Sequence, residues 1–145
     1  TKCIFCQMLT LDPKENDNLL VDMGEHTFTV LNLYPYNNGH LMIVPKRHTN
    51  DFSGLTKEEL TECFEKLQFA EKALRKVLNP HGFNIGANIG RVAGAGIEDH
   101  IHFHIVPRWN GDSNFMPIIG DVKVISQDLA ETKSKLLQAY SEIKR

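Results

Sequence analysis

The stretch His100-Ile101-His102-Phe103-His104-Ile105 carries a histidine at every second position. Successive side chains of a β-strand point to opposite faces, so a strand here would present three histidines on one face and three apolar residues on the other. Near neutral pH, histidine can be a nucleophile, a proton carrier or a metal ligand. The pattern predicts a strand that is packed on its apolar face and reactive on the other. The alternatives are a solvent-facing strand that is merely rich in histidine, or an isolated metal site.

Other stretches of alternating or continuous apolar residues predict further strands. The expected strands are His26–Asn32, Leu41–Val44, Phe83–Ile89 and Val122–Ile125. Strands, then a helix, then strands again, without a repeated βαβ pattern, favour an α+β fold with a mostly antiparallel sheet. Neither repeats nor linker-like segments divide the chain, so residues 1–145 are expected to form one domain.

Two helices are expected, a long central one and one at the C-terminus. Thr56 and Glu59 have the spacing of a capping box, which predicts a helix over Thr56–Leu78 that ends before Pro80. Its expected apolar face contains Leu60, Cys63, Phe64, Leu67, Leu74 and Val77. The second helix is expected to begin near Asp128. Its expected inward residues are Leu129, Leu136, Leu137, Tyr140 and Ile143.

The composition narrows the functional class. A net charge of −2 gives no electrostatic basis for binding nucleic acid or an anionic membrane. Apolar runs stay well short of the roughly 20 residues that span a bilayer. Three cysteines are an odd number, which disfavours a disulfide framework. We therefore expect a reducing, cytoplasmic setting.

Cys3-Ile4-Phe5-Cys6 places two thiols at a spacing that can share one Zn²⁺. Because no second Cys-x-x-Cys pair follows, histidines would have to complete a four-ligand site. A redox dithiol is the first alternative, but the βαβ context typical of that motif is missing. Two inert thiols are the second.

The segment Gly94-Ala95-Gly96-Ile97 comes just before the histidine stretch. Glycines let backbone N–H groups approach a phosphate closely and point several donors at one anion. A glycine-rich run alone is usually only a turn. Its place directly before the histidines predicts a phosphate cradle.

Two longer motifs resemble those of a known family. His100 to Arg108 (HIHFHIVPR) is similar to the signature of the histidine-triad nucleotidyl hydrolases and transferases, and Gly39 to Lys46 (GHLMIVPK) is similar to a second block of that family. The extension from Pro107 to Met116 resembles the diadenosine tetraphosphate phosphorylase branch more than the purine nucleoside phosphoramidase branch. The resemblance implies the histidine-triad fold and a nucleotide substrate.

For the reaction, the resemblance implies that His102 attacks the α-phosphorus and forms an AMP–histidine intermediate. His104 would contact the phosphate and assist the proton of the leaving group, and His40 would line the same pocket. Asn32 would contact the ribose and Asn88 the α-phosphate. Where relatives carry a serine or glutamine this chain has Gly96 and Ile97, so we expect backbone donors and His104 to supply the contacts to the leaving group.

The resemblance also implies accessory features. His48 and His100 would join Cys3 and Cys6 in a structural zinc site. Phe5, Val30 and Met42 would form walls of an adenine pocket, Lys46 and Arg108 are candidate anchors for an incoming anion, and Trp109–Met116 would lie at the pocket mouth. A homodimer is implied as well. The alternatives are a phosphoramidase-type hydrolase and a nucleotide-binding protein without catalytic activity.

Overall fold

The computed structural model describes residues 3–33, 38–97, 99–112 and 122–143. Its elements, in chain order, are α1 (Ile4–Gln7), η1 (Met8–Thr10), β1 (Leu20–Met23), β2 (Thr27–Leu31), β3 (Leu41–Pro45), η2 (Phe52–Gly54), α2 (Lys57–Leu78), β4 (Gly82–Gly86), η3 (Arg91–Ala93), β5 (Phe103–Arg108) and α3 (Val122–Glu142).

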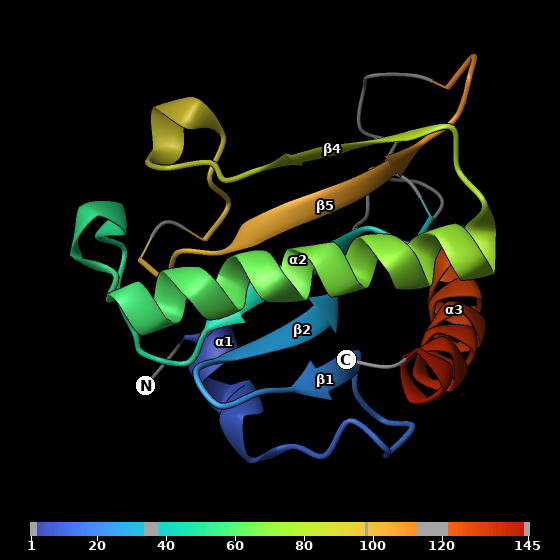
Figure 1. Ribbon diagram of the computed structural model, residues 1–145, viewed down its shortest axis with the longest axis horizontal. Helices are drawn as coiled ribbons and strands as arrows, with labels where there is room; N and C mark the ends of the chain where they lie inside the picture. Colours follow the sequence, from blue (N-terminus) through green and yellow to red (C-terminus); the bar gives the residue numbers. More distant parts are fainter. Residues whose placement is uncertain (1–2, 34–37, 98, 113–121, 144–145) are drawn as a thin grey trace.

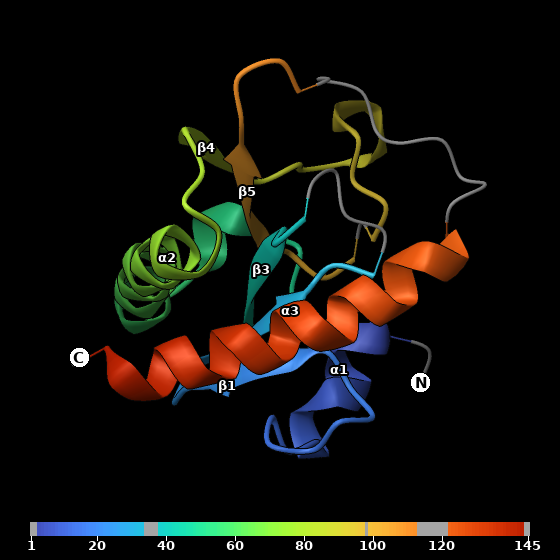
Figure 2. The same cartoon turned by 90° about the vertical axis from the view of Figure 1, so that its right-hand side faces the viewer.

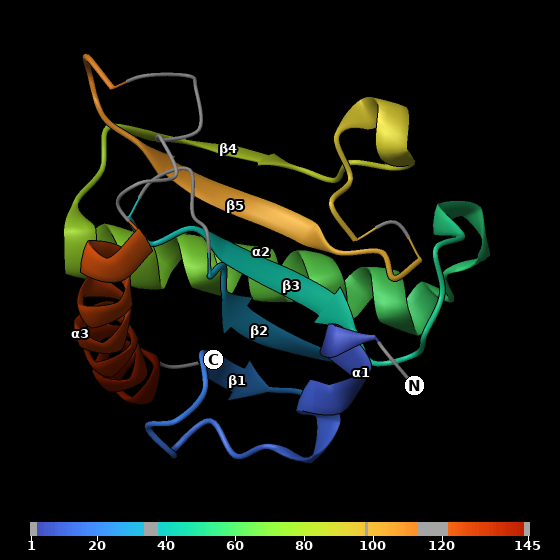
Figure 3. The ribbon, with the colours of Figure 1, turned by 180° about the vertical axis from the view of Figure 1, so that it is seen from behind.

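The five strands form one antiparallel sheet in the order β1-β2-β3-β5-β4. The long helix α2 lies along one face of this sheet, and the short α1 lies against the other face (Figures 1 and 3). Helix α3 packs beside β1 and against α2, across one end of the sheet (Figure 2). The expected α+β fold, with its antiparallel sheet, long helix and C-terminal helix, is confirmed.

Alternation along the central strands gives the sheet two different faces. Phe103 and Ile105 belong to the core beneath α2 and α3. His104 points the other way and pairs across the ladder with Met42, which belongs to a smaller core around Phe5. The face away from α2 therefore carries the histidines, as the period of two predicts.

Strand β5 begins at Phe103, so His100 and His102 precede it. The backbone leaves the ladder there because the N–H of Ile101 donates to the carbonyl of Thr49, at 2.8 Å, instead of continuing the pairing with β3. Ile101 is still buried in the core beneath α2. The alternation of the histidine stretch thus holds, although the regular strand is shorter than expected.

Helix α2 begins with the predicted capping box. The Thr56 hydroxyl accepts from the N–H of Glu59, and the Glu59 carboxylate accepts from the N–H of Thr56. Arg47 donates two further hydrogen bonds to that carboxylate and holds the pKa of Glu59 down to about 2. On the apolar face Cys63 is buried as expected, but the side chain of Phe64 is 58% exposed. The expectation that Phe64 is a core residue is wrong, because it lies at the margin of the sheet beside Phe103.

Other boundaries also differ from those expected. Val122–Ile125 forms the first turn of α3 rather than a strand; its β-branched residues favour strands only weakly, and the adjoining helix overrides that preference. Strand β4 ends at Gly86, three residues earlier than expected. The sequence reading missed β1 and α1, both only four residues long.

None of the helices within the described part of the chain combines the length and apolarity needed to cross a bilayer.

The capping box yields a prediction about stability. Thr56→Ala removes the hydroxyl that accepts from the Glu59 N–H, at 3.1 Å. The free energy of unfolding, measured by urea denaturation, should fall by about 1 kcal/mol. Thr61→Ala is the matched control, because Thr61 is exposed inside the same helix and should leave stability unchanged or slightly higher. Equal losses in the two variants would contradict a specific role for the cap.

Candidate functional site

A cavity of about 600 Å³ opens on the sheet face opposite α2. One part of its lining is polar, with His102, His104, Asn32, Asn88 and the glycine loop. The rest is mainly apolar and comes from the N-terminal segment and from strands β2 and β3. The apolar lining residues are Ile4, Phe5, Met8, Leu11, Leu19, Leu31, Leu33 and Met42.

The ring of His102 is oriented by a backbone carbonyl. Its Nδ1–H donates to the carbonyl oxygen of His100 at 2.9 Å, which leaves the lone pair on Nε2. The side chain is only 6% exposed, and burial lowers its pKa below the ordinary value. A neutral imidazole with a free Nε2 at the cavity wall has the protonation state that a histidine nucleophile requires.

A relay of hydrogen-bonding groups continues behind His104. Its Nδ1 lies 2.7 Å from Nε2 of His40, and Nδ1 of His40 lies 3.5 Å from the amide nitrogen of Asn32. If the Asn32 amide donates, His40 carries its proton on Nε2, and Nε2–H of His104 is then available to a ligand. Desolvation lowers the pKa of His40 to about 3 and that of His104 to about 4.

His40 is completely buried and contacts His104 from behind. It is not among the residues that line the cavity, which differs from the expected place at the pocket wall. The sequence could not separate the two placements, because a strand pattern does not tell which of two hydrogen-bonded histidines faces the cavity.

The glycine loop offers fewer backbone donors than expected. The N–H groups of Gly94 and Ala95 already donate to the carbonyls of Arg91 and Gly90. Gly94 has φ +97°, which favours glycine at this turn. Within the described residues, the N–H groups of Gly96 and Ile97 donate no backbone hydrogen bond. Gly94, Gly96 and Ile97 line the cavity, whereas Ala95 is buried beneath it.

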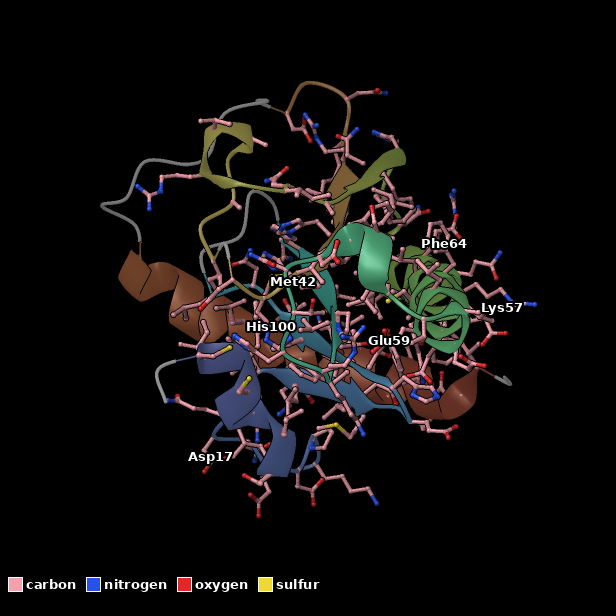
Figure 4. All side chains as sticks on the ribbon, turned by 90° about the vertical axis from the view of Figure 1, so that its left-hand side faces the viewer. Asp17, Met42, Lys57, Glu59, Phe64 and His100 are labelled. Atoms are coloured by element: carbon pink, nitrogen blue, oxygen red, sulfur yellow. The ribbon has the colours of Figure 1, made fainter. Side chains whose placement is uncertain are left out.

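Next to this cavity, four donor atoms from three segments converge. They belong to Cys3, Cys6, His48 and His100 and lie within 4.8 Å of one another. His100 lies beside α1, which contains Cys6 and is capped by Cys3 (Figure 4). Nδ1 of His100 lies 3.2 Å from Sγ of Cys3, 3.7 Å from Sγ of Cys6 and 3.2 Å from Nδ1 of His48.

These separations match the edges of a tetrahedral zinc site. Bonds of about 2.0 Å to nitrogen and about 2.3 Å to sulfur require N···N edges of about 3.3 Å and N···S edges of about 3.5 Å. Nε2–H of His100 donates to the carbonyl of Pro45 at 2.8 Å, which leaves Nδ1 unprotonated toward the cysteines. The donor set therefore fits zinc.

Some of the other residues expected at the pocket line the cavity, and others do not. Phe5 and Met42 line the cavity, but Val30 lies in the core behind it. The guanidinium of Arg108 is engaged by Asp112, at 2.7 Å and 2.9 Å, and Lys46 does not line the cavity.

The expected mouth segment Trp109–Met116 is only partly described. The structure describes it through Asp112, and residues 113–116 lie outside the described part. Sequence reasoning missed Asn18 and Leu19 as lining residues, since they follow a polar loop that carries no ligand-binding motif.

Comparison with known proteins finds a matching family model and several similar proteins. The model of the HIT domain family matches residues 13–111. An AP-4-A phosphorylase from Mycobacterium tuberculosis is 46% identical over 127 residues, which are 88% of this chain and 65% of that protein. The chain thus spans less than two thirds of this relative's length. The adenosine 5'-monophosphoramidase hnt1 of Schizosaccharomyces pombe is 31% identical, over 74% of this chain and 75% of the relative.

Among solved structures, the crystal structure of a Zn-bound histidine triad family protein from Mycobacterium smegmatis is similar. It has a TM-score of 0.77 and 27% identity, and the match covers 97% of this chain and 94% of that one. The matched family model and the arrangement of the three histidines agree. The chain belongs to the HIT family.

Proposed function

We propose that this protein is a nucleotidyl hydrolase or transferase that cleaves dinucleoside polyphosphates of the diadenosine tetraphosphate type at the α-phosphate. The observation that carries the proposal is the free Nε2 of His102, held at the cavity wall by the carbonyl of His100. The apolar lining suits a nucleoside, and the backbone of the loop Gly94–Ile97 suits the phosphates.

In the proposed reaction, Nε2 of His102 forms a bond to the α-phosphorus, and the bond from phosphorus to the bridging oxygen of the polyphosphate breaks. His104 donates a hydrogen bond from Nε2–H to the phosphate or the departing oxygen. The product of this step is AMP covalently joined to His102. Water or inorganic phosphate then attacks the same phosphorus, releases AMP or ADP and restores the free imidazole.

His40 and Asn32 support this step indirectly in the proposal. His40 holds the ring of His104 in the tautomer that has Nε2–H toward the cavity. Because both rings are desolvated, they stay neutral at pH 7 and can act as donor and acceptor without a charge change.

Phosphate is the proposed acceptor. The similarity to an AP-4-A phosphorylase is higher than the similarity to a phosphoramidase, 46% against 31% identity. Phosphoramidase-type hydrolysis is the second candidate, and it uses the same nucleophile.

We further propose a structural zinc ion bound by Cys3, Cys6, His48 and His100. The ion would supply a fixed cross-link between α1 and the histidine stretch and no step of the reaction. Phe5 lies between the two cysteines, and its ring centroid is 5.0 Å from that of His102. Holding the cysteines therefore also holds an apolar wall of the cavity.

A homodimer is the third part of the proposal. Helix α3 covers the β1 edge of the sheet, whereas β4 forms the other edge. Beside β4, Phe52 and Phe64 both contact Phe103 and are 44% and 58% exposed, and Ile85 of β4 is 54% exposed. A bare edge strand with an apolar margin suits pairing with a second copy.

The acceptor is tested by product analysis. With diadenosine tetraphosphate and millimolar phosphate, the protein should release ADP and ATP, because phosphate competes with water for the AMP–histidine. Chromatography of the products checks this. AMP and ATP at every phosphate concentration would make the protein a hydrolase.

The matched variants for the same assay are His102→Asn and His104→Asn. The first removes the reacting atom and should lose turnover by several orders of magnitude while still binding AMP. The second removes one stabilising contact and should be impaired less. Retention of most activity by His102→Asn would refute the covalent mechanism.

Metal content tests the zinc proposal. Protein purified without added metal should contain about one equivalent of zinc by elemental analysis. The Cys3→Ser, Cys6→Ser double variant should lose the metal, unfold at a lower temperature and bind AMP more weakly. Cys63→Ala is the control, because this thiol is buried in α2 away from the cluster, and the variant should keep the metal. Metal-free protein of unchanged stability would make the cysteine pair inert.

Light scattering after size-exclusion chromatography tests the dimer. The wild-type chain should have twice the mass of one chain, and Ile85→Asp should shift it to the monomer because a carboxylate at the interface is left desolvated. Leu9→Asp, at an exposed leucine in η1, should remain dimeric. A monomeric wild-type protein would contradict the proposal.

A further inference from the structure

Helix α3 carries a buried lysine whose ammonium group donates three hydrogen bonds. The side chain of Lys133 is 3% exposed. Its ammonium donates to the carbonyl of Glu15, to the carbonyl of Asn18 at 2.8 Å and to Oδ1 of Asn18 at 2.9 Å. All three acceptors belong to one loop, residues 12–18, which runs between η1 and β1.

This loop reaches the nucleotide cavity. Asn18, together with Leu11 and Leu19 on either side of the loop, lines the cavity. The amide of Asn18 also accepts from the N–H of Leu20, at 3.0 Å, and donates to the carbonyl of Asp12 at 3.0 Å. Within the described residues, the other hydrogen bonds of the loop join its members to one another or to Leu20. Lys133 is therefore what fastens the loop to a helix.

Burying the ammonium group of a lysine costs desolvation free energy, so stabilising the fold does not by itself explain a lysine here. Desolvation lowers the pKa of Lys133, and the carboxylates of Asp12, Glu15 and Asp17 act in the opposite direction. Burying a charged group costs free energy unless hydrogen bonds compensate for the lost hydration. What an apolar group cannot do is hold two carbonyl oxygens and a side-chain amide in fixed positions.

We propose that Lys133 is a positioning residue for the nucleoside: it holds loop 12–18 so that Asn18 forms a preformed part of the cavity wall, next to Leu19, whose carbonyl accepts from the N–H of Leu31. This inference rests on the proposed nucleotide function. Helix α3 runs beside β1 above the N-terminal segment (Figure 2), so the C-terminal helix contributes to the cavity through Lys133. None of its hydrogen bonds reaches the catalytic histidines in the described structure.

Lys133 is expected to affect nucleotide affinity without affecting the catalytic step. Without the Lys133 ammonium group, the loop must be ordered when the nucleotide binds, and the entropy cost of ordering reduces the binding free energy. His102 keeps its own support from His100. We therefore expect the affinity for AMP to fall and KM to rise, with kcat retained.

The experiment compares Lys133→Met with Lys135→Met in the full, zinc-loaded chain. Lys135 lies in the same helix, its side chain is 58% exposed, and it forms a surface ion pair with Glu131 at 3.5 Å. Calorimetry with AMP should show an affinity loss of roughly three- to tenfold in Lys133→Met, from the cost of ordering the loop. Turnover of diadenosine tetraphosphate should show a matching rise in KM and a kcat within about twofold of wild type. Lys135→Met should match wild type in both.

Amide hydrogen exchange provides a readout that needs no nucleotide. The N–H groups of Lys14 and Leu20, which donate to Asp12 Oδ1 and Asn18 Oδ1, should exchange faster in Lys133→Met and not in Lys135→Met. If Lys133→Met does not fold, Lys133→Gln is used in its place, because its shorter amide keeps a donor and should give an intermediate effect.

Each outcome decides a different point. Faster exchange with unchanged AMP affinity and KM would overturn the positioning role and leave Lys133 a purely structural residue. Unchanged exchange would overturn the fastening of the loop itself. A fall in kcat with unchanged KM would also contradict the proposal. A wild-type protein that does not bind AMP would overturn the proposed function as well, whereas binding by wild type and Lys133→Met alike overturns this inference alone.

Discussion

The site depends on one residue, His100, which bonds in three directions. Its Nε2–H donates to the carbonyl of Pro45 at the end of β3, and its backbone carbonyl accepts from Nδ1–H of His102. Its Nδ1 faces Cys3, Cys6 and His48. The orientation of the proposed nucleophile, the anchoring of the N-terminal segment and the end of β3 therefore all involve His100.

Burial gives this arrangement its chemical character. His40, His100 and His102 are at most 6% exposed, and desolvation is the largest cause of the lowered pKa in each of them and in His104. Neutral rings can be aligned by hydrogen bonds of definite direction, whereas adjacent imidazolium ions would repel one another. The two-faced sheet makes this possible, because Phe103 and Ile105 bury the opposite face beneath α2.

Periodicity in the sequence was enough to predict the sheet face of the histidines and most of the strands, and the spacing of Thr56 and Glu59 predicted the capping box of α2. The period of two at residues 100–105 carries that information directly, since side chains alternate in extended backbone even just before β5 begins. The proposed zinc ligands His48 and His100, which would join Cys3 and Cys6, came from a family resemblance, because cysteine spacing alone leaves the histidine partners open. The structure brings these four residues together, while their binding of zinc remains a prediction.

Other features could not be read from local pattern. The exposure of Phe64 depends on where the sheet ends, and the first turn of α3 has residues that also suit a strand. The buried contacts of Lys133 join residues 115 and more positions apart in the chain, and a lysine within a charged helix gives no local sign of burial. The placement of His40 behind His104 is likewise a tertiary contact that neither motif specifies.

The most direct test of the central claim is nitrogen NMR of the histidine rings in the intact protein at pH 7. His102 should be a neutral imidazole with its proton on Nδ1, hydrogen-bonded to the carbonyl of His100, and with Nε2 unprotonated. A proton on Nε2, or a protonated imidazolium at pH 7, would contradict the assignment of His102 as a nucleophile oriented by His100.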